Sequence, residues 1–147
     1  MIAQSIQLAL APVFVLVAIG NIMNILTTRM GRMVDRARHL QALHSGTEGN
    51  EHDAVVIEMR HIDQRIAHIG RALLLLVLSG LAVGTTVCSL FVSEFTRTDL
   101  RLLTAATFVL AITLLMGALV LLLLETRLAA RTLRLPPALL ELERGKL

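Results

Sequence analysis

The chain has 147 residues, of which 55% are hydrophobic and 17% are charged, and its mean hydropathy is +0.73. Three runs without an ionisable side chain, residues 2–28, 72–93 and 102–124, hold nearly half of the chain. A soluble domain of this size spreads its charges along amphipathic elements, so this segregation excludes that class. The net charge of +3 does not indicate nucleic-acid binding, because the basic residues flank the apolar runs.

Residues 2–28 predict the first transmembrane helix. A helix of this length extends about 40 Å, which exceeds the ~30 Å hydrocarbon core of a bilayer. Four arginines follow within residues 29–39 and mark the end of the span. The apolar run is too long for a cleaved signal peptide and lacks a cleavage site, so we expect it to stay as an anchor.

Residues 29–71 predict an antiparallel helical hairpin whose two arms continue the first and second transmembrane helices. Apolar residues repeat at a and d heptad positions in both arms and run into the spans. These residues are Met23, Leu26, Met30, Met33, Ala37, Leu40 and His44 in the first arm, and Val55, Met59, Ile62, Ile66, Ile69 and Leu73 in the second. Turn residues at 45–50 separate the arms, and Gly46 suits the position that follows the first helix.

The hairpin also predicts ion pairs between its arms. A turn centred near residues 47 and 48 places Arg32 near Asp63 and Asp35 near Arg60, so opposite charges meet twice. Exposed pairs contribute only about 0.2–1 kcal/mol each, so we expect them to select the register while the apolar residues hold the arms together.

Residues 72–93 and 102–124 predict the second and third transmembrane helices. The loop of residues 94–101 is short, so these helices should be antiparallel neighbours. Thr96 or Thr98 suits the N-cap of the third helix, which we expect to continue into the tail, residues 125–147, as far as Pro136.

Two glycines in the second span, Gly80 and Gly84, form a small-residue motif. Such spacing permits close approach of another helix. Cys88 continues the same stripe and is the single cysteine of the chain, so we interpret it as a packing residue.

The distribution of arginine and lysine predicts the orientation. Residues 29–71 hold seven and the tail holds five, whereas the 94–101 loop holds two. The positive-inside rule therefore places the hairpin and the C-terminus in the cytoplasm, and the N-terminus and the loop outside.

Asn21, Asn24 and Thr28 lie at i, i+3 and i+7 and share one face of the first span. Carboxamides are costly in lipid, so they should face protein or water. One interpretation is hydrogen bonding between helices. The other is a ring around an oligomer axis, where carboxamide oxygens replace the water around a cation.

Arg29, Arg32 and Arg36 form a basic face with the same spacing just beyond the span. Contact with anionic lipid headgroups is the plain interpretation. A cationic lining inside an oligomeric vestibule is the alternative.

The pattern of polar residues does not predict an enzyme. No carboxylate, lysine, arginine or histidine lies inside a span, and the sequence lacks a phosphate loop, a nucleophile constellation and a metal-ligand cluster. His61 and His68 lie two turns apart on one helix face, too far apart to hold one metal ion. We therefore expect no catalytic residue, no cofactor and no metal.

Three segments, Leu10–Gly20, Asn24–Arg29 and Val34–Arg38, resemble an uncharacterised bacterial family of three-span membrane proteins. That family is catalogued only as a domain of unknown function. The resemblance implies a membrane location and an α-helical fold, and it supplies no activity and no functional residue. We expect an all-α protein of the bacterial inner membrane.

With 16.1 kDa and three spans, one copy cannot enclose a large cavity, so we expect a homo-oligomer in contact with membrane lipids. The leading hypothesis is a small pore or ion channel lined by the first helix. The alternative is a structural or regulatory membrane module whose hairpin, a cytoplasmic coiled coil, mediates protein–protein contacts.

Overall fold

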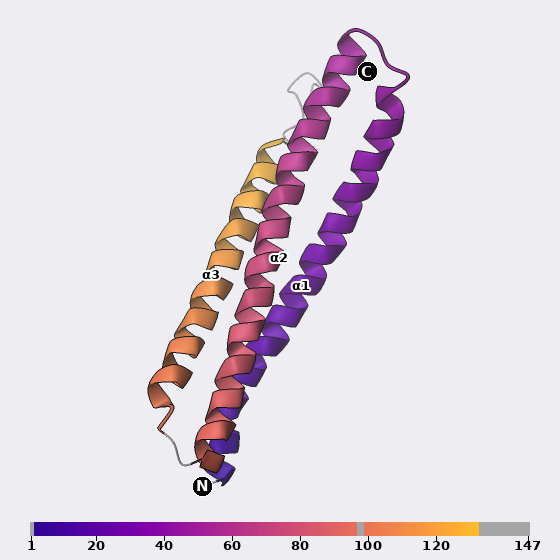
Figure 1. The fold of residues 1–147 in the computed structure, drawn as a ribbon. Helices are drawn as coiled ribbons and strands as arrows, with labels where there is room; N and C mark the ends of the chain where they lie inside the picture. The colour runs from indigo at the N-terminus through magenta and orange to yellow at the C-terminus, as the bar shows by residue number, and fades with distance from the viewer. Residues whose placement is uncertain (1, 97–98, 133–147) are drawn as a thin grey trace, which may run out of the picture.

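The computed structural model describes residues 2–96 and 99–132, and these residues contain helices and turns but no strand. The helices are α1 (Ile2–His44), α2 (Asn50–Thr96) and α3 (Arg101–Thr132), shown in Figure 1. Each is long and apolar enough to cross a membrane, which indicates a multi-pass membrane protein.

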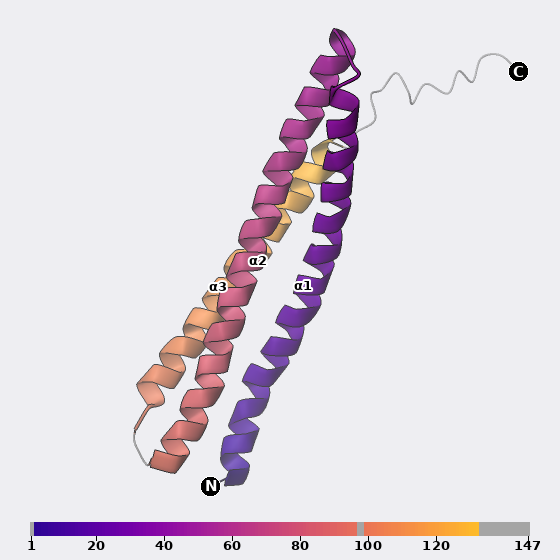
Figure 2. The same cartoon turned by 45° about the vertical axis from the view of Figure 1, so that its right-hand side comes forward.

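The helices lie side by side with α2 in contact with both neighbours. α1 and α2 are antiparallel and form the predicted hairpin, and each is one uninterrupted helix across the change from apolar to charged sequence. α3 runs back along α2 and ends below the hairpin tip (Figures 1 and 2). The charged part of the hairpin therefore extends beyond the three-helix part.

The interface between α1 and α2 is built from the predicted heptad residues, and Leu76 extends their line by one further position. Leu26 of α1 and Ile69 and Leu76 of α2 are at most 1% exposed, and Leu40 and Ile62 continue the buried line into the hairpin. Burying an aliphatic side chain of this size contributes about 1.5–3 kcal/mol, so this line dominates the stability of the pair.

The turn between the arms differs from its prediction in one residue. Gly49, immediately before α2, has the left-handed φ of 64° that favours glycine. The N–H of Gly46 donates to the carbonyl of Leu43 at 3.0 Å and closes the last turn of α1. The left-handed position therefore belongs to Gly49, which directly precedes α2, and not to Gly46, which follows α1.

At the start of α3, Thr96 does not act as the N-cap. The side chain of Asp99 accepts the N–H of Arg101, the first residue of α3, at 3.1 Å, and the carbonyl of Leu100 accepts the N–H of Thr104 at 2.9 Å. The hydroxyl of Thr96 instead donates to the carbonyl of Val92 within α2. Thr98 and the tail beyond Thr132, including Pro136, lie outside the described residues.

Small hydroxylated residues join α2 to α3. Ser79 Oγ donates to the carbonyl of Ala111 at 2.7 Å, and Thr86 Oγ1 donates to Thr107 Oγ1 at 2.9 Å. Nearer the connecting loop, the hydroxyls of Ser89 and Thr104 are 2.8 Å apart. Ser79, Thr86 and Ser89 are all buried, so these interhelical bonds run inside the apolar region.

We expect Thr86→Val to weaken this interface. The change keeps the shape of the side chain but removes its bond to Thr107, and such bonds between membrane helices average about 0.6 kcal/mol. Thr85→Val is the matched control, because Thr85 is exposed and bonds only within its own helix. Thermal unfolding in detergent should separate the two variants, and an equal loss of stability in both would contradict this role for Thr86.

Candidate functional site at the charged end of the apolar helices

Glu125 follows the apolar run of α3, and its side chain is only 2% exposed. Its Oε2 accepts a hydrogen bond from Arg29 Nη1 of α1 at 2.8 Å. Its Oε1 accepts two bonds from Arg65 of α2, from Nη2 at 2.8 Å and from Nε at 3.2 Å. One carboxylate thus connects all three helices where the uncharged sequence ends.

The heptad pattern explains why two arginines meet there. Arg29 and Arg65 each precede an a position, and such g positions flank the apolar line and face each other in an antiparallel pair. Two guanidinium groups so placed repel each other unless a negative charge lies between them. Glu125 supplies that charge from α3, so the two arginines and the carboxylate form one structural unit.

One heptad further along the hairpin, the same positions hold opposite charges. Arg36 donates to both carboxylate oxygens of Glu58, at 2.8 and 3.1 Å. The hydrogen bond from Arg36 to Glu58 and the charge of Glu58 raise the pKa of Arg36. No third helix is needed at this level, because the arms neutralise each other directly.

This pairing corrects the ion pairs predicted from the sequence. Neither Arg32–Asp63 nor Asp35–Arg60 is formed: all four side chains are exposed and make no ion pair within the described residues. The physical reason is their heptad position. Arg32, Asp35 and Arg60 lie on outward positions, whereas ion pairs form between residues that border the apolar line.

Besides the Glu125 cluster, the candidate site includes the face of α1 that carries Asn21, Asn24 and Thr28. All three are exposed and lie on the side of α1 opposite Leu26, which packs against α2. The hydroxyl of Thr28 donates to the carbonyl of Asn24 at 2.9 Å. The carboxamides of Asn21 and Asn24 make no hydrogen bond to any described residue, so within this chain they do not join helices.

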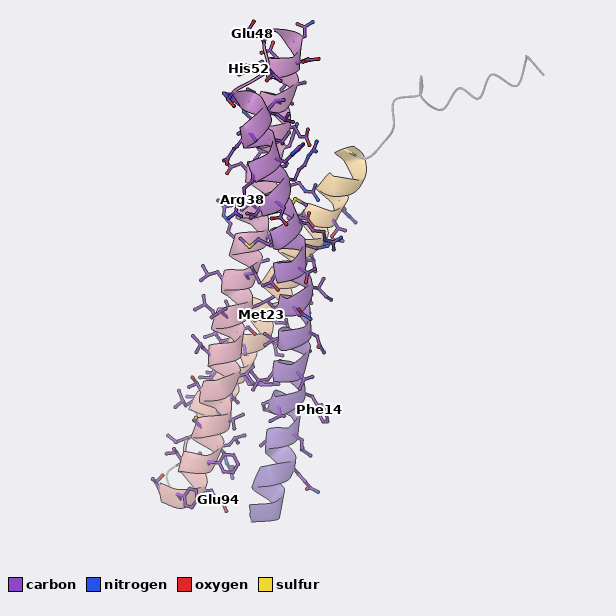
Figure 3. All side chains as sticks on the ribbon, turned by 90° about the vertical axis from the view of Figure 1, so that its right-hand side faces the viewer. Phe14, Met23, Arg38, Glu48, His52 and Glu94 are labelled. Carbon is purple, nitrogen blue, oxygen red and sulfur yellow. The ribbon has the colours of Figure 1, made fainter. Side chains whose placement is uncertain are left out.

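This face differs from the outward face of α3. The exposed side chains there include Val109, Leu110, Val120 and Leu123, which suit contact with lipid tails. On α1, Phe14 points away from the other helices (Figure 3), and the exposed face turns polar at Asn21. Among the described helices, α1 thus presents carboxamides where α3 presents hydrocarbon.

The glycine motif of α2 makes little contact inside the chain. A Cβ built on Gly80 would lie 4.0 Å from Leu16 Cδ2, an ordinary contact distance, and one built on Gly84 would meet nothing within 4 Å. The tight glycine is Gly117 of α3, where a Cβ would lie 3.3 Å from Leu75 Cδ1. Close approach of a helix from another chain at Gly84 stays a prediction, and Cys88 is exposed beside it.

The histidines lie along the hairpin. His44 and His52 face each other near its tip, with ring centroids 4.4 Å apart. His61 is exposed, and His68 Nδ1 lies 2.7 Å from the carbonyl of Gln64. Across residues 2–96 and 99–132, no group of three or more histidine, cysteine, aspartate or glutamate side chains is arranged to hold a metal ion.

A family model described as "Protein of unknown function (DUF2721)" matches residues 9–135. The chain belongs to the DUF2721 family. This confirms the resemblance to an uncharacterised family that the sequence indicated. The DUF2721 region includes Glu125, both of its arginine partners and the carboxamides of α1. Neither a curated protein nor a solved structure matches this chain.

Proposed function

We propose that this DUF2721 protein is a homo-oligomeric integral membrane protein in which α1 helices from several copies surround a small ion-conducting pore. Asn21, Asn24 and Thr28 line that pore. The observation that carries the proposal is the pair of exposed carboxamides on α1 that have no hydrogen-bond partner among the described residues.

The carboxamides of Asn21 and Asn24 need neighbours that can form hydrogen bonds with them. An amide moved from water into hydrocarbon without a hydrogen bond costs about 2–7 kcal/mol. Lipid tails offer no such bond, so Asn21 and Asn24 require protein or water beside them. Because α2 and α3 pack elsewhere, further copies of the chain are the nearest source, and closed symmetry is the usual form of such assemblies.

A water-filled axis suits the chemistry of this face better than a dry helix contact. Asn21, Asn24 and Thr28 follow one another at one-turn intervals, so a ring of copies would stack carboxamide and hydroxyl oxygens along the axis. Val17, one turn earlier and 58% exposed, would supply an apolar ring beside them. Polar rings next to an apolar constriction are an arrangement found in channels.

The proposed setting is the bacterial inner membrane. The excess of arginine and lysine in the hairpin and the tail supports a cytoplasmic hairpin and C-terminus, with the N-terminus outside. The hairpin then extends from the cytoplasmic mouth of the pore.

A membrane module that docks a partner through the hairpin is the second candidate. Leu43 and Ile57 are exposed near the hairpin tip, at 42% and 58%. They are two apolar side chains on a mainly polar surface, and single exposed residues of this kind are common on proteins. The pore proposal therefore rests on the stronger observation.

The test combines oligomer mass with conductance. In mild detergent we expect the protein to exceed a dimer, and in planar bilayers to conduct ions. Replacing both Asn21 and Asn24 with leucine should abolish the current, whereas Thr113→Leu, a polar-to-apolar change on the exposed face of α3, should leave it unchanged. A monomer or dimer would refute the pore, and an oligomer silent under all ion and voltage conditions would favour the module.

A further inference from the structure

The ion pairs with Glu125 leave several N–H donors of Arg29 and Arg65 unused. A guanidinium carries five N–H donors in a planar fork. Arg29 uses only Nη1 on Glu125, and Arg65 uses Nε and Nη2. The side chains remain 35% and 23% exposed. Their unused N–H groups are thus fixed in direction and accessible from outside.

The cluster has a positive excess. Arg29 and Arg65 share one carboxylate, which leaves one positive charge. Arg32 lies one turn after Arg29 on the same flank of α1, is exposed, and makes no ion pair to any described residue. By contrast, Arg36 further along is neutralised by Glu58. At the level of Glu125, the three arginines thus carry two positive charges that no carboxylate among the described residues pairs with.

That level is the edge of the apolar helices. Arg29 follows residues 2–28, and Glu125 follows residues 102–124, so both end uncharged runs. If these runs lie in the bilayer, the cluster lies at the depth of the lipid phosphates. Arginine is well suited to such a ligand, since its planar fork matches phosphate oxygens and its charge persists at the membrane surface.

From this arrangement, we propose that Arg29, Arg32 and Arg65 form a binding site for the phosphate of an anionic phospholipid headgroup, with Glu125 as the positioning residue. The site needs the apolar helices to lie in a membrane, but it does not depend on conduction. It goes beyond general attraction to a charged surface, because one buried carboxylate fixes two of its three arginines.

The test measures how many lipids the full-length protein retains, by native mass spectrometry of protein released from nanodiscs. Nanodiscs of phosphatidylglycerol and phosphatidylcholine are compared for the unmodified protein and for two variants. Arg32→Gln removes a residue of the proposed site that is exposed and makes no ion pair to any described residue. Arg38→Gln removes another exposed arginine, six residues or about 9 Å further along the same helix at ~1.5 Å per residue.

We expect phosphatidylglycerol to be retained over phosphatidylcholine, and Arg32→Gln to lower its retention about fivefold. That factor corresponds to ~1 kcal/mol per basic residue near an anionic surface. Arg38→Gln should change nothing. Equal losses in both variants would show diffuse attraction and overturn the site, as would equal retention of the two lipids. Displacement of the lipid by millimolar inorganic phosphate would also overturn it, in favour of a soluble anion site.

Discussion

We expect Glu125→Gln to lower the thermal midpoint of the protein more than any other single carboxylate substitution in the described chain. The variant leaves Arg29 and Arg65 facing each other without the charge between them. Removing one partner of a buried ion pair costs about 3–5 kcal/mol. Because both arginines are partly exposed, water solvates them in the variant and reduces this cost. We expect the free energy of unfolding to fall by about 2–3 kcal/mol, which corresponds to a decrease in the thermal midpoint of roughly 6–10 °C.

The measurement is far-ultraviolet circular dichroism of purified protein during heating, since the chain has no tryptophan or tyrosine for intrinsic fluorescence. Glu58→Gln is the matched control. It removes one carboxylate from an exposed pair with Arg36, so its effect should be much smaller. Similar decreases for both variants would show that Glu125 does not organise the three helices.

In the proposed pore, Asn24→Asp should create a ring of carboxylates, and we expect the variant to select cations over anions. An added attraction of ~1.4 kcal/mol for a permeating cation corresponds to a tenfold change in preference, so we expect about that shift in the permeability ratio. The reversal potential across a salt gradient measures it. Asn24→Gln is the control, because it keeps the carboxamide and should keep the original selectivity.

The same variant distinguishes a pore lining from a dry helix contact. If Asn24 only joins helices, aspartate places like charges in a low-dielectric interface, and repulsion disperses the assembly. A dissociated protein without current would therefore contradict the pore proposal, even though the oligomer itself would have been shown.

The helices and their main interface were predictable because they follow from simple periodic patterns. The lengths of the three uncharged runs predicted the apolar segments, and the heptad spacing predicted that Leu26, Leu40 and Ile69 are buried. The uninterrupted helices through Arg29 and Arg71 followed from the same spacing, because the heptad pattern continues across the change from apolar to charged sequence.

The site at Glu125 was harder to predict, since it depends on three segments distant in sequence. The ion pairs predicted from the sequence did not take heptad position into account. The g positions border the apolar line, and they hold Arg29, Arg36, Glu58 and Arg65, which form the ion pairs of the structure. Two arginines at facing g positions were a signal that a third element must supply a carboxylate. The rotation of α3, which points Glu125 inward, depends on its packing through Ser79 and Thr86.

The lining of the pore by α1 can be tested directly with a cysteine at position 24 and a charged methanethiosulfonate reagent added during a bilayer recording. Asn24→Cys is made together with Cys88→Ser, because the native cysteine is exposed. Val109→Cys in the same background is the control, since Val109 is 63% exposed on α3. We predict that the reagent blocks the current of the position-24 variant and leaves the position-109 variant unaffected. An unaltered current at position 24 would contradict the account.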